Sequence, residues 1–150
     1  KIVIDSILSK EYHIVLGHSQ GAILLSSIIS TSPRILLDDS DNDARPKTPR
    51  GYIFNGAAWP NPFTTELESL SSQFLTSSST SVKKALFVIG KRDKINPPEG
   101  AERVLQSLQK LSAIDVHTCY HEGGHSVPTQ NEEAVSEIVS WILRLVQDEH

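Results

Sequence analysis

The chain has 150 residues, of which 38% are hydrophobic, and a formal net charge of −4 at pH 7. These values suit a single domain over residues 1–150. The absence of a basic block argues against nucleic acid or an anionic membrane surface as the main partner. No apolar run approaches the ~18 residues that a membrane-spanning helix needs. The single cysteine, Cys119, and the lack of an N-x-S/T site favour a reducing, cytoplasmic setting.

Helical and strand patterns alternate along the chain. Apolar spacing and capping residues predict helices, whereas short apolar runs predict strands. The expected helices cover residues 2–10, 20–30, 64–75, 97–111 and 130–146, and the expected strands cover 13–16, 51–56, 85–89 and 114–120. Two polar stretches, near 38–50 and 76–82, are predicted to be mobile loops.

This alternation predicts an α/β fold with a mostly parallel sheet and helices on both faces. The continuous apolar run 85–89 is typical of a strand that is buried on both sides. The run 114–120 alternates between apolar and polar residues, so we expect it at an edge of the sheet. Asn96 and Thr129 are the expected N-caps of the last two helices. Functional groups should gather at the carboxyl ends of the strands.

The pentapeptide Gly17-His18-Ser19-Gln20-Gly21 joins the strand 13–16 to the helix that follows it. It has the G-x-S-x-G pattern of a nucleophile elbow, in which a serine lies at the apex of a sharp turn. The glycines on either side are expected to let the neighbouring backbones approach without a Cβ clash. The alternative is an ordinary strand-to-helix turn in which the serine is incidental.

Two further polar residues follow predicted strands, Asp93 after 85–89 and His125 after 114–120. A serine hydroxyl is a poor nucleophile at neutral pH, so an imidazole must take its proton and a carboxylate must orient that imidazole. Ser19, Asp93 and His125 therefore form a candidate catalytic triad. Asp115 and Glu99 compete with Asp93 for the acid role, but the first lies within a strand and the second within a helix cap.

The segment His121-Glu122-Gly123-Gly124-His125 also spells the H-E-x-x-H motif of zinc proteases. That motif needs a helix, and two adjacent glycines cost about 2 kcal/mol of helix propensity relative to alanine. We therefore expect a loop and no metal, with zinc hydrolysis by His121 and His125 as an alternative. His117 and His121 are interpreted as strand and loop histidines without a role.

Two other sets of residues complete the expected site. The backbone N–H of Gln20, at the start of the helix, should be one donor of the oxyanion hole. Trp59, Pro60 and Phe63 follow the strand 51–56 and either form a wall of the acyl pocket or pack an ordinary loop. Cys119 is expected to be a packing residue, because no basic group lies where it would lower the thiol pKa.

With these residues in place, the chain resembles the FSH serine hydrolases, a branch of the α/β-hydrolases similar to the phospholipase/carboxylesterase group. The segments that carry the resemblance are 15–22, 52–60, 88–97 and 121–128. The resemblance implies Ser19 as nucleophile, Asp93 as acid and His125 as base, acting on small ester or thioester substrates without a cofactor.

The same resemblance implies further strands before the elbow and, among them, a loop that gives the second oxyanion donor. We therefore expect a separate N-terminal chain or segment to complete the fold, so that residues 1–150 would be its C-terminal part. The predicted function is hydrolysis of a carboxylic ester or thioester through an acyl-enzyme. The alternative from another class is a non-catalytic binding module with the same fold.

Overall fold

A computed structural model describes residues 2–9, 12–32, 48–61, 64–73, 82–111 and 113–147. Helices and strands alternate in the predicted order. They are α1 (Ile2–Ser9), β1 (Ile14–His18), α2 (Gln20–Thr31), β2 (Gly51–Asn55), α3 (Thr64–Gln73), β3 (Lys83–Gly90), α4 (Pro98–Gln109), β4 (Ile114–His121) and α5 (Glu132–Gln147). Most of the two predicted mobile loops, residues 38–47 and 76–81, lies outside the described residues.

The four strands form one sheet in the order β1-β2-β3-β4, and every neighbouring pair is parallel. The fold class is therefore α/β, as the alternation of elements predicted. Residues 85–89 of β3 are all buried, which confirms the expected central strand. Among the described residues β4 forms one edge of the sheet, as predicted, and β1 forms the other.

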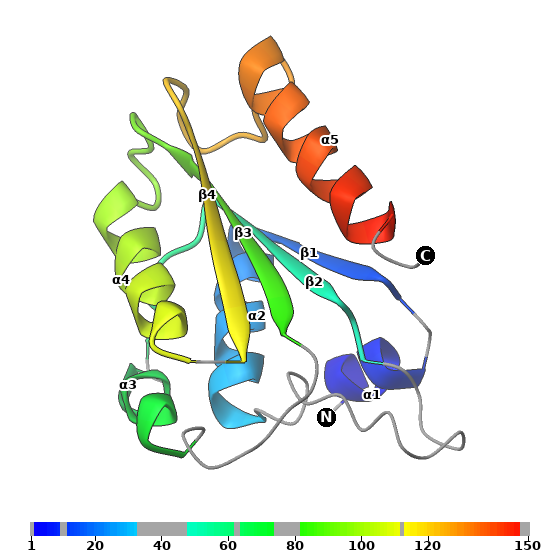
Figure 1. The fold of residues 1–150 in the computed structure, drawn as a ribbon. Helices are drawn as coiled ribbons and strands as arrows, with labels where there is room; N and C mark the ends of the chain where they lie inside the picture. The colour runs from blue at the N-terminus through cyan, green and yellow to red at the C-terminus, as the bar shows by residue number, and fades with distance from the viewer. Residues whose placement is uncertain are drawn as a thin grey trace.

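Helices pack on both faces of the sheet (Figure 1). On one face α1 to α4 enclose the larger core, in which the rings of Phe54 and Phe87 stack with centroids 4.6 Å apart. On the other face α5 covers a smaller core through Trp141 and Leu145. Both faces of β2 and β3 are thus covered, so packing on both sides fixes the positions of the carboxyl ends of these strands.

The two helix starts differ from the sequence prediction. The N-cap of α4 is Pro97 and not Asn96, whose side chain is hydrogen-bonded to Gly56 instead. At α5 the Asn131 side chain accepts the N–H of Ala134 at 2.9 Å, so Asn131 is the cap and Thr129 is not. The first cap was predicted one residue too early and the second two residues too early. Several residues at each start can cap a helix, and only the tertiary contacts select one of them.

Cys119 of β4 is buried beneath α5, with its Sγ 4.0 Å from the carbonyl oxygen of Ala134. Burial, followed by the neighbouring Glu137 and Glu133 carboxylates, raises the pKa of this thiol to about 12. The thiol therefore stays protonated and acts as a packing group.

A set of exposed apolar side chains lies on β1 and α5. Leu16 is 56% exposed, and its register partner Ile53 belongs to the core under α5, so Leu16 is on that same face. On α5, Glu137 meets His117 of β4 on one side of the helix, and a row of exposed apolar residues lies on the opposite side. We call these residues the apolar strip: Leu16, Val135, Val139, Leu143 and Val146.

No described helix has the length and apolarity to cross a membrane.

Candidate active site

Ser19 occupies the turn between β1 and α2 and has φ 53° and ψ −117°. It is the one non-glycine residue with positive φ among the described residues. Such a conformation costs roughly 1–3 kcal/mol and persists only where neighbouring contacts hold it. Here the Ser19 N–H donates to the Asn55 carbonyl at 2.9 Å, and the Ser19 carbonyl accepts N–H groups from Ala22 and Ile23. The strand, sharp turn and helix predicted for this segment are therefore present.

The two glycines of the pentapeptide are not equivalent, contrary to the sequence interpretation. A Cβ atom on Gly17 would lie 2.6 Å from the carbonyl oxygen of Gly21 and 2.8 Å from Cα of Ala22. A Cβ atom on Gly21 would meet nothing within 4 Å. Close approach of the strand and the helix thus requires a glycine at position 17 alone, because α2 crosses over that end of β1.

The side chains of Ser19, His125 and Asp93 form one continuous line of hydrogen bonds. The Ser19 Oγ lies 2.7 Å from Nε2 of His125, and the Nδ1 of His125 lies 2.7 Å from Oδ2 of Asp93. With a neutral imidazole, the proton on Nδ1 is donated to Asp93 and Nε2 accepts the serine hydroxyl. The three residues come from the carboxyl ends of β1, β3 and β4, and the imidazole remains 16% exposed.

Asp93 is held as a carboxylate by the groups around it. Burial alone would raise its pKa, but hydrogen bonds from His125 and from the N–H groups of Asn96 and Ile95 outweigh burial and lower the pKa. Both N–H groups donate to Oδ1 at 2.9 Å, so Oδ2 is left for the imidazole. The other two carboxylates considered for this role, Asp115 and Glu99, are exposed on β4 and α4.

The loops after β3 and β4 are joined by main-chain hydrogen bonds. Lys91 N–H donates to His121 O at 2.9 Å, and Arg92 N–H donates to Gly123 O at 3.0 Å. A Cβ atom on Gly90 would lie 2.9 Å from the Gly123 carbonyl oxygen, so only glycine allows this approach. Asp93 and His125 are therefore brought together by an extension of the β3–β4 pairing.

The segment 121–125 does not form the helix that a zinc-protease motif requires. His121 is the last residue of β4, not a loop residue as predicted, and residues 122–126 form turns and bends. The Nδ1 of His121 accepts the N–H of Gly123 at 3.2 Å, whereas His125 is directed to Asp93 and Ser19. Burial lowers the pKa of His121, although Asp93 and Glu122 partly oppose this shift.

Three residues that were not predicted to belong to the site also contribute to it. Gly56, with φ 58°, passes so close to His125 that a Cβ atom would lie 3.0 Å from Cε1 of the ring. Asn96 donates from Nδ2 to the Gly56 carbonyl at 2.7 Å, which ties the loops after β2 and β3 together. Asn55 binds the Ser19 backbone, and its side chain contacts His18. The Asn-Gly pair at the end of an apolar strand was the available signal.

The remaining predicted site residues have mixed outcomes. Gln20 is the first residue of α2, so its N–H belongs to the first helical turn, where N–H groups have no intrahelical partner. Trp59 packs against the larger core and lies under Arg103, whose Cζ is 4.0 Å from the ring centroid. Pro60 is buried, and Phe63 lies outside the described residues.

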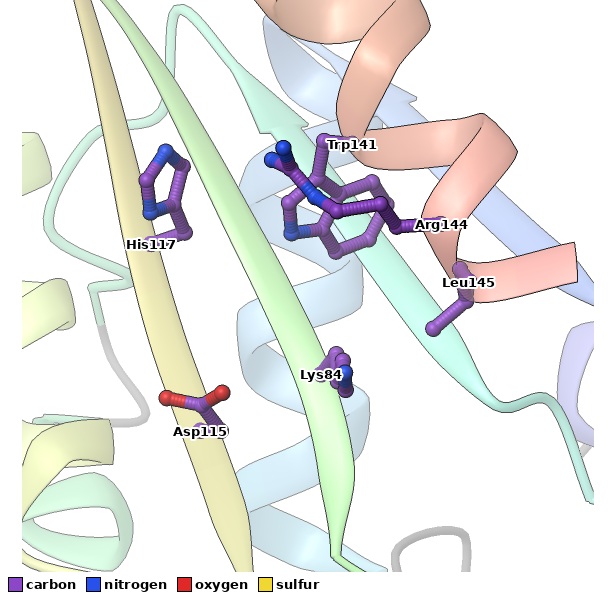
Figure 2. A pocket seen from close by; sticks show the side chains of 6 residues that line it. All are labelled: Lys84, Asp115, His117, Trp141, Arg144 and Leu145. Carbon is purple, nitrogen blue, oxygen red and sulfur yellow. The ribbon is translucent and has the colours of Figure 1, made fainter. Parts of the chain in front are cut away.

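One cavity, of about 140 Å³, lies away from this site (Figure 2). It opens between α5 and the first halves of β3 and β4, whereas Ser19 and His125 are at the carboxyl ends of the strands. Its lining residues are Lys84, Asp115, His117, Trp141, Arg144 and Leu145. None of them contributes to the hydrogen bonds around Ser19, so the cavity is separate from the candidate active site.

Comparison with known families gives one match over most of the chain. The family described as "Serine hydrolase (FSH1)" matches residues 1–136. No curated protein matches the chain significantly in sequence.

Solved structures show the same fold at low sequence identity. Acyl-protein thioesterase 2 from Zea mays superposes with a TM-score of 0.68 at 18% identity, over 96% of this chain and 62% of that one. A variant of SOBER1 from Arabidopsis thaliana gives 0.60 at 22% identity, over 97% and 60%. The Bacillus cereus carboxylesterase gives 0.54 at 14% identity, over 88% and 49%. The chain has the α/β-hydrolase fold and spans between 49% and 62% of these structures.

Proposed function

Because the chain belongs to the serine hydrolase family FSH1, we propose that it hydrolyses a small carboxylic ester or thioester through an acyl-enzyme on Ser19. The observation that carries this proposal is the line of 2.7 Å contacts from Ser19 through His125 to Asp93. A hydroxyl that donates to an imidazole can lose its proton as it attacks, and the carboxylate stabilises the imidazolium that forms. No cofactor is needed for this chemistry.

The reaction has two half-reactions that use the same base. Ser19 Oγ attacks the substrate carbonyl carbon while its proton moves to His125 Nε2. Collapse of the tetrahedral intermediate breaks the bond to the alcohol or thiol, which leaves with that proton. Water then attacks the acyl-enzyme, His125 takes a proton from it, and collapse releases the carboxylic acid and returns the proton to Ser19.

The negative oxygen of each tetrahedral intermediate needs hydrogen-bond donors. We assign one of them to the backbone N–H of Gln20, which immediately follows the nucleophile at the start of α2. The second donor is proposed to come from a loop that precedes the elbow, on the separate N-terminal chain or segment that the family resemblance implies. Loss of one such donor typically costs about 10²–10³ in rate.

The substrate class rests on two arguments. The fold is similar to that of an acyl-protein thioesterase and of a carboxylesterase, which supports an ester or thioester over an amide. Trp59, Pro60 and Phe63 follow β2 and are proposed as the apolar wall beside the acyl group. The cation–π contact between Arg103 and Trp59 would hold this wall in place.

A fluorophosphonate probe tests the nucleophile directly, because it reacts with an activated serine and leaves a stable phosphonyl group. We expect one label per chain, lost in Ser19→Ala and strongly reduced in His125→Ala. Ser136→Ala is the matched control, because Ser136 is an exposed serine of α5 and takes no part in the hydrogen bonds around Ser19. Labelling that persists in Ser19→Ala would contradict the mechanism.

Turnover of a p-nitrophenyl ester separates this proposal from its alternatives. A hydrolase should release p-nitrophenol at a rate that Ser19→Ala abolishes and that a zinc chelator leaves unchanged. A folded protein that neither turns over the ester nor takes the label would instead support a binding module. Inactivation by the chelator, with recovery on adding zinc, would support the metal-dependent alternative.

A further inference from the structure

Asn55 makes two different contacts to the residues around the nucleophile. Its carbonyl oxygen accepts the N–H of Ser19 at 2.9 Å, and its side-chain Nδ2 lies 2.7 Å from Nδ1 of His18. The Asn55 residue is only 2% exposed, so this amide is fixed in the end of β2. One residue thus holds both the nucleophile's backbone and the imidazole that precedes it.

The contact with Asn55 selects the tautomer of His18. The amide nitrogen of Asn55 can only donate, so Nδ1 of His18 must accept and carries no proton. The ring is then neutral, with its proton on Nε2. If the amide were reversed, the nitrogen with its two N–H groups would occupy the place of Oδ1, which is buried and has no partner. Two buried N–H groups would then be unpaired, so the orientation that donates to His18 is favoured.

The state of His18 matters because its ring lies beside the proposed catalytic base. The ring centroids of His18 and His125 are 5.3 Å apart, and the rings are tilted by 40°. His125 becomes an imidazolium in each half-reaction, and Asp93 on its far side balances that charge. A protonated His18 would place a second positive charge beside it and oppose proton transfer from Ser19.

We propose that Asn55 is a positioning residue that holds His18 as the neutral Nε2–H tautomer, so that His125 accepts the Ser19 proton without a second cation beside it. This inference rests on the proposed function for its kinetic consequence. The tautomer itself is a property of the free protein and does not depend on the proposed function.

The tautomer is tested by NMR on protein labelled with ¹⁵N-histidine. In the unmodified protein at neutral pH, His18 should give the nitrogen shifts of a neutral ring protonated at Nε2, assigned by comparison with His18→Phe. An Nδ1–H tautomer or a protonated ring would overturn the proposal. The measurement needs neither turnover nor a variant of Asn55, so it is independent of whether Ser19 is catalytic.

The kinetic consequence is tested with Asn55→Asp. A carboxylate beside Nδ1 favours the protonated imidazole, so kcat/KM for a p-nitrophenyl ester should fall about tenfold at pH 7. The loss should be recovered at higher pH. A purely structural effect of Asn55→Asp would instead lower kcat/KM by the same factor at every pH, and that result would overturn the proposal.

A double-mutant cycle completes the test. His18→Phe removes the titrating ring, so adding Asn55→Asp to it should introduce no new pH dependence in kcat/KM. If the recovery at high pH persisted in the double variant, His18 would not be its source and the inference would be wrong. If the parent protein shows the predicted tautomer but no labelling of Ser19, the proposed function fails and the tautomer assignment stands.

Discussion

Gly56 lies against the imidazole of His125, close enough that any Cβ atom would come within 3.0 Å of Cε1 and 3.1 Å of Nδ1. Its φ of 58° is also a conformation that glycine adopts most readily. The loop after β2 therefore limits the position of the His125 ring, and the hydrogen bond with Asp93 fixes its Nδ1.

Gly56→Ala should accordingly reduce activity more than stability. The positive φ costs roughly 1–2 kcal/mol for a residue with a Cβ atom, and the methyl group displaces the imidazole from Ser19. Because a displacement of about 1 Å can cost 10²-fold in rate, we expect kcat/KM to fall on the order of 10²-fold. Ester turnover and urea unfolding, measured on the same preparation, check both parts. A variant that loses stability but keeps the parent kcat/KM contradicts the proposed contact.

The two glycines of the nucleophile elbow make a matched pair for stability. Gly17→Ala should destabilise the protein by roughly 1–3 kcal/mol, because the Cβ atom would overlap the backbone of α2. Gly21→Ala should be neutral or stabilise by up to about 1 kcal/mol, since that position is open and alanine is the better helix former. Urea unfolding of both variants gives the comparison. Equal losses of stability would show that close packing at Gly17 is not the reason for the glycine.

Asp93→Asn should lower kcat/KM on the order of 10³–10⁴-fold, because an amide cannot hold His125 in the required tautomer or balance its charge. Asp115→Asn is the control, since Asp115 is exposed on β4 and far from the hydrogen bonds around Ser19. Ester turnover at saturating and low substrate distinguishes kcat from KM. Comparable losses in both variants would remove Asp93 from its proposed role.

Asp93 should also contribute to acid stability, and the sign follows from its lowered pKa. The unfolded chain takes up this proton at a pH near 3.9, whereas the folded protein does so only at lower pH. The stabilisation is therefore complete above about pH 3.9 and is lost as the pH falls through the folded value. Urea unfolding between pH 3 and 5 should show a steeper pH dependence in the parent protein than in Asp93→Asn.

His121 predicts a second pH dependence, at less acidic values. Burial lowers its pKa in the folded protein, so below a pH of about 6.5 the unfolded state binds the proton more readily. Stability should rise with pH up to about 6.5 and then level off. His121→Asn removes the titration, and its Oδ1 can still accept the N–H of Gly123. Parallel stability curves for the parent and this variant between pH 5 and 7 would exclude the effect.

The apolar strip on β1 and α5 should make the chain prone to self-association. Exposed apolar patches and open strand edges are sites of association in general. Val139→Glu and Leu143→Lys should each shift the sedimentation profile toward the monomer, whereas Gln106→Lys on the exposed face of α4 should not. An unchanged distribution in all three variants would show that the strip does not mediate contacts between copies.

The sequence predicted the order and type of the described elements because their apolar periodicity is local and strong. Buried strands such as 85–89 and the elbow around Ser19 carry their signal within a few neighbouring residues. The exact helix caps were predicted less well, since Asn96 is bound to Gly56 on another loop and could not also cap α4.

The contacts that adjust the site could not be predicted in the same way. The packing of Gly56 under His125 and the bond between Asn55 and His18 join strands that are far apart in the chain. They depend on the register of β1 and β2, which places His18 directly opposite Asn55. A pattern in one sequence does not contain that register, so the Asn-Gly pair could be noticed in the sequence but its contacts with His18 and His125 could not.

The pairing between the loops after β3 and β4 determines which of the three hydrogen-bonded residues can separate from the others. Asp93 and His125 belong to one β-α-β unit, and their partnership needs nothing from β1. Ser19 reaches that unit across the β1–β2 boundary, through its N–H bond to Asn55 and its contact with His125. Slippage or detachment of the first strand would therefore separate Ser19 from His125 and leave the hydrogen bond between His125 and Asp93 intact.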